Sequence, residues 1–286
     1  MVSEAHVRRI PVWKAACVVV LMLLTSGCER TVLAFVNQGV PEARQHETYS
    51  PEKSLGLDIY RPTGKAEGPV PVVVFFYGGA WQRGSAAQYR FVGQRLAEQG
   101  WLAIVADYRT WPRVGFPGFV EDGAEAVAWA QKNAARLGGD PQRIYLMGHS
   151  AGAQIAVLLG TDARYLARHQ IKPSSLAGVI GLAGPYDFNI TGQYVPIFGP
   201  PSQWPDAMAL NFVDGDEPRF LLIHGDEDKV VWPRNSEGLA ARLRANGIQA
   251  TVLIMPGDGH AAPLLSLYRP KSRPQVIAAI QEFIAR

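Results

Sequence analysis

From about residue 49 onward, short apolar runs alternate with segments whose apolar residues recur at helical spacing. Leu55–Tyr60 alternates apolar and polar residues, and Val70–Phe76 is an almost unbroken β-branched and aromatic run, typical of a strand buried on both faces. Further strands are expected at Trp101–Ala106, Ile144–Met147, Leu176–Leu182, Arg219–His224 and Ala250–Met255.

Helices are expected between these strands. Ala86–Gln99 stops before a glycine, and Val120–Leu137 stops before two. The other expected helices are Ala151–Leu159, Ser236–Ala245 and Pro274–Ile284. Strands separated by helices predict an α/β fold with a mostly parallel sheet covered on both faces. No repeat or linker divides residues 49–286, so they are predicted to form one domain.

The first 28 residues have the pattern of an export signal. Three basic residues precede Ala15–Leu24, a run of ten apolar residues, whereas a membrane-spanning helix needs about 20. The run Leu24–Cys28 resembles the lipobox of bacterial lipoproteins, which implies cleavage after residue 27 and lipid on Cys28. We expect a protein of the cell envelope with a lipid anchor in the membrane. An ordinary signal peptide, giving a secreted or periplasmic soluble protein, is the alternative. Residues 28–48 lack a period and are interpreted as a tether.

Composition and charge narrow the function classes. With 286 residues, 48% hydrophobic and 19% charged, the chain is neither disordered nor fibrous. The net charge of +3 falls to +1 without residues 1–27, which hold three basic residues and one acidic one. No basic block exceeds Arg8-Arg9, so no nucleic-acid partner is expected. Cys17 would be removed and Cys28 acylated, which leaves no pair for a disulfide.

The pentapeptide Gly148-His-Ser-Ala-Gly152 is the strongest chemical signal. It has the form G-x-S-x-G and lies between an expected strand and an expected helix, where a sharp turn exposes the hydroxyl of Ser150. Alone, the motif could be an ordinary strand-to-helix turn. In this context we interpret Ser150 as a nucleophile.

A serine nucleophile needs a histidine base and an orienting carboxylate. The chain has six histidines. His260, in a glycine-rich loop after the last expected strand, is the best candidate. His149 would point away from the serine, and His224 closes a strand, where we expect it to hold a turn. For the acid, Asp226 and Asp228 both follow an expected strand, while Glu227 and Asp258 are interpreted as solvated loop charges.

Several motifs together resemble the α/β-hydrolase superfamily, near its carboxylesterase and hormone-sensitive-lipase-like branch, which includes kynurenine formamidase-like and isoprenylcysteine methylesterase-like members. The resemblance covers residues 49–286. The motifs are Leu57-Asp-Ile-Tyr-Arg-Pro62, Tyr77-Gly-Gly-Ala-Trp81, Asp107-Tyr-Arg109, Gly148-His-Ser-Ala-Gly152, His224-Gly-Asp-Glu-Asp228 and Gly259-His260.

This resemblance assigns further roles. It implies the α/β-hydrolase fold and a triad of Ser150, Asp228 and His260, because the acid stands four residues after the histidine of the His-Gly pair. It also implies an oxyanion hole made by the backbone N–H groups of Gly79, Ala80 and Ala151.

Two parts of these motifs, Tyr77 and Asp107-Tyr-Arg109, are not assigned a catalytic role. Tyr77 stands where the family usually has a histidine that shapes the oxyanion loop, which leaves the subfamily open. Asp107-Tyr-Arg109 is interpreted as structural support.

The insert at about residues 185–218 is expected to form a small, irregular cap over the site. Its aromatic residues would suit a short acyl or aryl group, or simply pack the insert onto the domain; they are Tyr186, Phe188, Tyr194, Phe198, Trp204 and Phe212. Trp81 and Trp232 flank the expected catalytic loops, so they too could either line a substrate pocket or serve only in packing.

The expected function is hydrolysis of small carboxylic esters through an acyl-enzyme on Ser150. The alternatives are an amide or peptide hydrolase with the same triad, and a non-catalytic envelope binding protein that retained the fold. No motif for a metal or a cofactor is present, so neither is expected.

Overall fold

The computed structural model describes residues 31–43, 45–64 and 67–286. The chain divides into two units, Met1–Gly39 and Val40–Arg286. In the first unit, residues 31–36 are helical. The predicted signal segment and Cys28 lie outside the described residues. Among the residues described, no helix is both long and apolar enough to cross a lipid bilayer.

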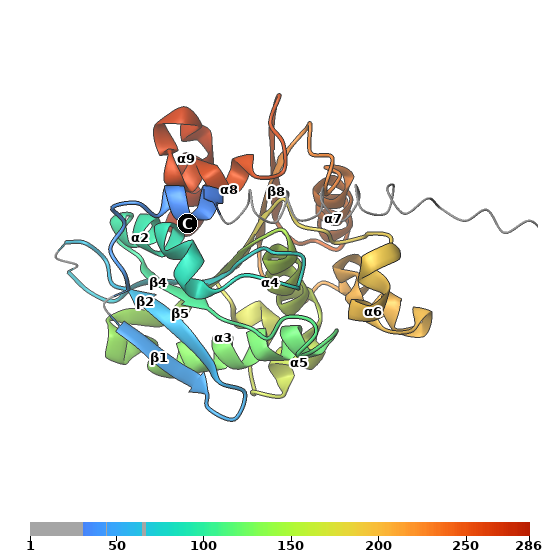
Figure 1. Cartoon of the computed structure of the whole chain (residues 1–286), viewed down its shortest axis with the longest axis horizontal. Helices are drawn as coiled ribbons and strands as arrows, with labels where there is room; N and C mark the ends of the chain where they lie inside the picture. The colour runs from blue at the N-terminus through green and yellow to red at the C-terminus, as the bar shows by residue number, and fades with distance from the viewer. Residues whose placement is uncertain (1–30, 44, 65–66) are drawn as a thin grey trace, which may run out of the picture. The chain divides into compact units, whose positions relative to one another are not determined.

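The second unit is built on an eight-stranded sheet with the order β1-β2-β4-β3-β5-β6-β7-β8 (Figure 1). The strands β1 and β2 pair antiparallel, as do β2 and β4, and all other neighbours are parallel. The strands are β1 Gln45–Ser50, β2 Leu55–Tyr60, β3 Val70–Phe76, β4 Leu102–Ala106, β5 Gly139–His149, β6 Gly178–Leu182, β7 Phe220–Gly225 and β8 Ala250–Met255. The predicted mostly parallel sheet is confirmed.

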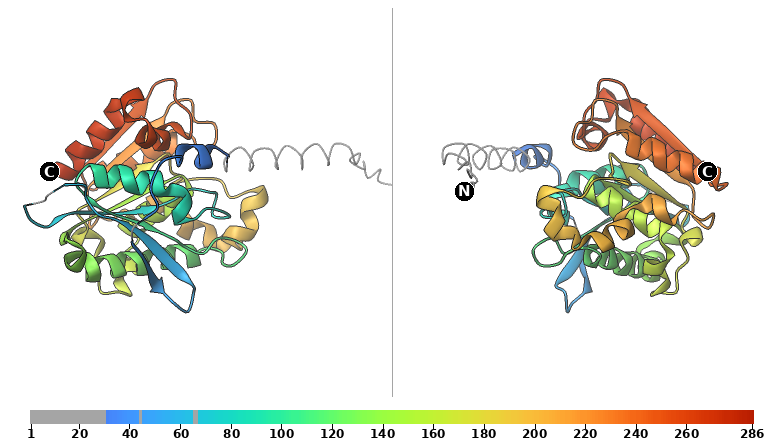
Figure 2. Two further views of the ribbon diagram at one scale, coloured as in Figure 1. Left: turned by 60° about the vertical axis from the view of Figure 1, so that its left-hand side comes forward. Right: turned by 90° about the vertical axis from the view of Figure 1, so that its right-hand side faces the viewer.

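Helices cover both faces of this sheet (Figure 2). On one face α2 contacts α8, which contacts α9, and on the other α3 packs against α4. The helices are α2 Arg90–Glu98, α3 Gly118–Leu137, α4 Ala151–Thr161, α5 Ala163–Ala167, α6 Val195–Phe198, α7 Arg234–Ala245, α8 Ala262–Tyr268 and α9 Pro274–Ala285. The core strands β3 and β4 are buried along their whole length, which agrees with their apolar sequences.

The strand β1 corrects the interpretation of residues 28–48 as a tether, because it begins at Gln45. Its sequence is polar on both faces and half exposed, so no hydrophobic period marks it. Polar contacts accompany its ladder with β2: His46 Nδ1 lies 2.8 Å from an oxygen of Asp58, and Glu47 pairs with Arg136 at 2.8 Å. An edge strand of this kind is invisible to a search for apolar alternation.

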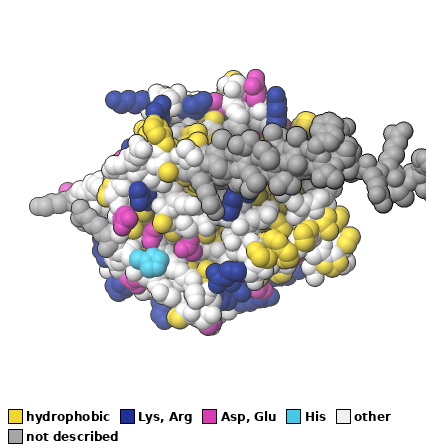
Figure 3. Space-filling model, in the orientation of Figure 1, with side chains coloured by type: hydrophobic (Ala, Val, Ile, Leu, Met, Phe, Trp, Pro, Cys, Tyr) yellow, Lys and Arg dark blue, Asp and Glu magenta, His cyan; other side chains and the backbone are white. Residues whose placement is uncertain are grey.

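The insert between β6 and β7 is a chain of short helical turns rather than an irregular loop. Around α6 it contains the 3-10 helices Gly192–Tyr194, Pro201–Ala207 and Ala209–Phe212. Phe198 is fully buried, while Val195 is 39% exposed. Hydrophobic side chains gather on the surface of this segment (Figure 3).

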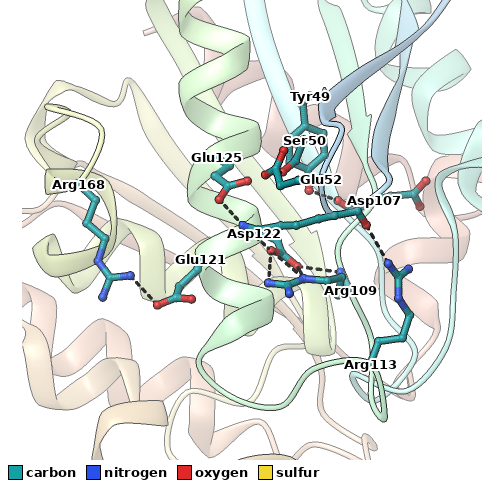
Figure 4. Close-up of polar contacts among 11 residues, drawn as sticks. Tyr49, Ser50, Glu52, Asp107, Arg109, Arg113, Glu121, Asp122, Glu125 and Arg168 are labelled. Carbon is teal, nitrogen blue, oxygen red and sulfur yellow. Dashed lines mark hydrogen bonds and ion pairs between the residues drawn. The ribbon is translucent and has the colours of Figure 1, made fainter.

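The motif Asp107-Tyr-Arg109 supports the structure through an ion-pair cluster centred on Asp122 (Figure 4). The carboxylate of Asp122 is fully buried in α3 and accepts two guanidinium N–H groups of Arg109 at 2.8 and 2.9 Å. It also accepts the backbone N–H of Arg109 at 3.0 Å, and the ammonium of Lys53 lies 3.2 Å away. The cluster therefore joins the start of α3 to the loop after β4 and the turn after β1.

Replacing Asp122 by alanine should destabilise the fold, because it leaves the partly buried guanidinium of Arg109 without its carboxylate and removes one of the two carboxylates that pair with Lys53. We expect a loss of about 2–4 kcal/mol in the free energy of unfolding. The matched control is Glu121→Ala in the same helix, whose exposed ion pair with Arg168 should contribute less than about 1 kcal/mol. Urea unfolding measures both, and equal losses for the two variants would contradict this account.

Candidate active site

Ser150 occupies the turn between β5 and α4, where its backbone has φ 53° and ψ −120°. A non-glycine residue rarely adopts this left-handed conformation, and its occurrence here needs support from its surroundings. The N–H of Ser150 donates to the carbonyl of Leu182 on the neighbouring strand β6 at 2.9 Å. The strained turn is thus held in place by the sheet edge.

The two glycines of the motif allow this turn by their lack of a side chain. A Cβ on Gly148 would lie 2.2 Å from the carbonyl oxygen of Gly152, and one on Gly152 would lie 2.1 Å from that of Phe76. Both distances are far below a van der Waals contact with backbone atoms. The glycines therefore let the chain turn tightly from β5 into α4 and let α4 approach the end of β3.

His260 lies in the loop after β8 and faces the serine. Its Nε2 is 2.9 Å from Oγ of Ser150, and its Nδ1 is 2.7 Å from Oδ2 of Asp228. The imidazole is 19% exposed. Because the ionised Oδ2 can only accept a hydrogen bond, Nδ1 carries the proton and donates it in that bond, which leaves the lone pair of Nε2 toward the hydroxyl of Ser150. This is the tautomer that general-base chemistry requires.

Asp228, in the loop after β7, is the carboxylate that the structure brings to His260. Its side chain is fully buried, and Oδ1 accepts the backbone N–H groups of Val230 at 2.8 Å and Val231 at 2.9 Å. Burial alone would raise the pKa of Asp228, but hydrogen bonds from His224 and His260 and from the backbone hold that pKa well below its usual value. The carboxylate is therefore ionised throughout the neutral range.

The rival carboxylates have other partners. Asp226 is exposed and accepts the N–H of Gly257 at 2.7 Å, while Asp258 forms an ion pair with Arg273. Glu227 is exposed. The three acidic side chains next to Asp228 in sequence or space thus do not contact the imidazole of His260.

Two further histidines line this constellation, and neither was predicted to take part in the site: His149 was expected to point away from the serine, and His224 to hold a turn. His149 is buried, and its Nε2–H donates to the backbone carbonyl of His260 at 3.1 Å. Burial lowers the pKa of His149 to about 3, so its ring is neutral and braces the His260 loop. His224 contacts Asp228 directly, with Nε2 3.1 Å from Oδ2. The only sequence signal was their position inside the serine and aspartate motifs.

The loop Tyr77–Trp81 lies beside the nucleophile, as a Cβ on Gly78 would be 3.4 Å from Cβ of Ser150. Gly79, Ala80 and Trp81 all have positive φ, which turns successive peptide groups of this loop. In the described part of the chain no hydrogen bond uses the N–H of Gly79 or Ala80. Ala151 is the first residue of α4, where backbone N–H groups lack partners within the helix.

Tyr77 occupies the position of the histidine that the family usually has in this loop, and it is held by aromatic and hydrogen-bond contacts. Its ring stacks between those of Tyr89 and Tyr108, with centroids 5.4 and 4.5 Å away. Its hydroxyl donates to Asp107 at 3.1 Å, and Tyr108 donates to the carbonyl of Tyr77 at 2.7 Å. Burial raises the pKa of Tyr77 well above its usual value, so the phenol stays protonated. The ring and hydroxyl of Tyr77 thus contact Tyr89, Tyr108 and Asp107, and these contacts hold the start of the loop.

Trp81 connects the same loop to the insert between β6 and β7. Its indole stacks on Phe188 with centroids 5.7 Å apart and meets Phe198 edge-on at 4.8 Å. Its Nε1–H donates to Gln154 of α4, whose amide donates to the carbonyl of Ala207 in the insert. Trp81 is buried, whereas Trp232 is 61% exposed. The aromatic residues that meet Trp81 thus pack the insert onto the domain.

The described residues contain no group of three or more histidine, cysteine or acidic side chains that could hold a metal ion. Both carboxylate oxygens of Asp228 accept hydrogen bonds from N–H groups.

Comparison with known proteins identifies the family. Residues 57–243 match the model of the BD-FAE family, which covers more than half of the chain. The chain belongs to the BD-FAE family. This domain is 33% identical over 243 residues to the esterase LipC of Mycobacterium tuberculosis (strain ATCC 25618 / H37Rv), with 78% of this chain and 60% of that protein covered.

Other relatives agree with this assignment. A probable isoprenylcysteine alpha-carbonyl methylesterase of Oryza sativa subsp. japonica is 31% identical over 247 residues, covering 74% of this chain and 55% of the relative. The BD-FAE chain thus spans less than two thirds of the length of these relatives. Among solved structures, Thermogutta terrifontis esterase 2 phosphoramylated by tabun superposes with a TM-score of 0.73 at 25% identity, covering 86% and 96% of the two chains. The predicted resemblance to the carboxylesterase branch of the α/β-hydrolases is confirmed.

Proposed function

We propose that this chain hydrolyses carboxylic esters through an acyl-enzyme on Ser150. The observation that carries the proposal is the continuous chain of hydrogen bonds from Ser150 Oγ through His260 to Asp228, with heavy-atom distances of 2.9 and 2.7 Å. The esterases among its relatives support the same reaction class.

In the first half of the reaction, His260 Nε2 takes the proton of the Ser150 hydroxyl while Oγ forms a bond to the ester carbonyl carbon. His260 then returns that proton to the departing alcohol, whose bond to the carbonyl carbon breaks. In the second half, water loses a proton to His260 Nε2 while its oxygen forms a bond to the acyl carbon. His260 then returns that proton to Oγ of Ser150, whose bond to the acyl carbon breaks and releases the acid. Asp228 stays ionised and stabilises the imidazolium that forms in both halves.

The developing oxyanion would be stabilised by the N–H groups of Gly79, Ala80 and Ala151. Three observations support this assignment. Gly78 lies close to Ser150, and the next two residues, Gly79 and Ala80, have positive φ. Ala151 is the first residue of α4. Each such donor typically changes the rate by about 10²–10³-fold.

The substrates we propose are small esters with short acyl or aryl groups. The support is the size of the insert, a short run of helical turns that packs on Trp81 and is too small to form a large lid over a long acyl chain.

Replacing Ser150 by alanine should abolish ester hydrolysis, because no other group in the constellation can form the acyl-enzyme. We expect kcat/KM for p-nitrophenyl acetate and butyrate to fall by at least about 10³-fold. The matched control is Ser175→Ala, an exposed serine whose hydroxyl donates to the carbonyl of Lys172.

Equal rates for the wild type and Ser150→Ala would overturn the proposed reaction. Absence of turnover in the folded wild type, across esters and the corresponding amides, would instead indicate a binding protein that retained the fold.

We further propose that Cys28 carries lipid and anchors the protein in a membrane of the cell envelope. The support is the sequence of the segment before it, with a basic start, ten apolar residues and small residues up to the cysteine.

Cys28→Ser should move the protein from the membrane to the soluble fraction when the full chain is produced in a bacterium, because the thiol that accepts lipid is lost. Immunoblots of fractionated cells measure this. Cys17→Ser is the matched control, since that residue lies in the segment to be removed, and it should leave the distribution unchanged. A soluble wild type, or a membrane-bound Cys28→Ser, would contradict the anchor.

A further inference from the structure

A second imidazole binds the carboxylate oxygen that orients His260. Nε2 of His224 lies 3.1 Å from Oδ2 of Asp228, and Nδ1 of His260 lies 2.7 Å from the same oxygen. Both His224 and Asp228 are fully buried. The Asp228 carboxylate therefore serves two histidines, of which only one faces Ser150.

The hydrogen-bond partners of His224 fix where its proton lies. Nε2 faces only acceptors, Oδ2 of Asp228 and the carbonyl of Val231 at 2.8 Å, so Nε2 carries the proton and shares it between them. Nδ1 therefore accepts a hydrogen bond from the hydroxyl of Ser236, with Oγ 2.8 Å away. Ser236 is a fully buried residue of α7. Every polar atom of this buried ring has a partner.

With His224 included, the carboxylate of Asp228 receives four N–H groups. Two imidazoles donate to Oδ2, and the backbone of Val230 and Val231 donates to Oδ1. Each donor withdraws part of the negative charge that would otherwise face His260. The strength with which Asp228 stabilises the His260 imidazolium thus depends on what else Oδ2 binds.

We propose that His224 is a positioning residue that shares Oδ2 of Asp228 with His260, and so sets the pH range in which His260 works as a base. The inference rests on the proposed function, since it concerns the base of that reaction. During acylation the Ser150 proton moves to His260 Nε2, while His260 keeps its Nδ1–H and His224 keeps its Nε2–H. His224 exchanges no proton with the substrate.

Other titratable groups near the two rings are accounted for. His149 packs its ring 5.0 Å from that of His260 and is kept neutral by burial, with a pKa of about 3. Asp258, on the loop between β8 and His260, is paired with Arg273. The remaining charged side chains of the β7–α7 loop and the first turn of α7 are exposed; they are Asp226, Glu227, Lys229, Arg234 and Glu237. Asp228 is the charged group in direct contact with both rings.

The direction of a pH shift distinguishes this role from a structural one. If the donor at Oδ2 is lost and Asp228 stays in place, more charge remains for the His260 imidazolium, and the acidic limb of the kcat/KM profile moves to higher pH. If His224 only holds the turn, its loss loosens Asp228 and the limb moves to lower pH or stays where it is while kcat falls.

The test compares His224→Asn with His224→Gln. The shorter asparagine amide reaches the position of Nδ1, near Ser236, and withdraws the donor from Oδ2. The longer glutamine amide reaches the position of Nε2 and retains the donor. Rates for a short-chain ester are measured by pH-stat from pH 5 to 9, and unfolding midpoints establish that each variant is folded.

We expect the acidic limb of His224→Asn to move up by about 0.5 pH unit or more, and that of His224→Gln to stay within about 0.2 unit of the wild type. A limb that stays or moves down in folded His224→Asn overturns the inference. If the wild type is active, Ser150→Ala is inactive and the acidic limb of His224→Asn has not moved, the inference about His224 is wrong but the proposed function stands. Wild type without activity contradicts the proposed function.

A second measurement does not depend on the folding of a variant. Nitrogen–proton correlation spectra of the histidine rings in the wild type at pH 8 should show His224 protonated on Nε2 alone. A proton on Nδ1 would overturn the inference, because Nε2 could then donate nothing to Asp228.

Discussion

The buried carboxylate of Asp228 is the group on which the rest of the site depends. A carboxylate removed from water is stable only when its oxygens are hydrogen-bonded, and here four N–H groups satisfy them. The same bonds fix the carboxylate in position, so His260 is held by one nitrogen and aims the other at Ser150. The ionised state of Asp228 and the tautomer of His260 are two consequences of one arrangement.

The parallel sheet brings these residues together. Ser150, Asp228 and His260 follow β5, β7 and β8, which run in the same direction with only β6 between the first two. Their loops therefore meet at the carboxyl edge of the sheet, where sites of open α/β folds gather. β6 contributes more than spacing, because the carbonyl of Leu182 holds the strained turn at Ser150. The insert after β6 packs on Trp81, which links it to the loop beside the serine.

The sequence predicted the parts of this molecule that rest on apolar periodicity or on a compact motif. The buried strands and the serine turn are of this kind, since a long apolar run or a pair of glycines leaves few alternatives. The polar edge strand β1 was missed, because a ladder to β2 and contacts such as His46 with Asp58 hold it without an apolar face. The position of His224 beside Asp228 was also missed, since a buried hydrogen bond four residues apart has no periodic signal. The choice of Asp228 over Asp226 needed the family resemblance, and the structure shows the physical difference: one is buried against His260 and the other exposed.

The most direct test of the central claim is covalent labelling of the folded protein with an organophosphonate ester, followed by peptide mass spectrometry. Thermogutta terrifontis esterase 2, a structural relative, is phosphoramylated by tabun, which is another organophosphorus reagent. The account predicts one adduct, on the peptide that contains Ser150, formed at least about 10²-fold more slowly when His260 is replaced by alanine. An adduct on another residue, or none on folded wild-type protein, would contradict it.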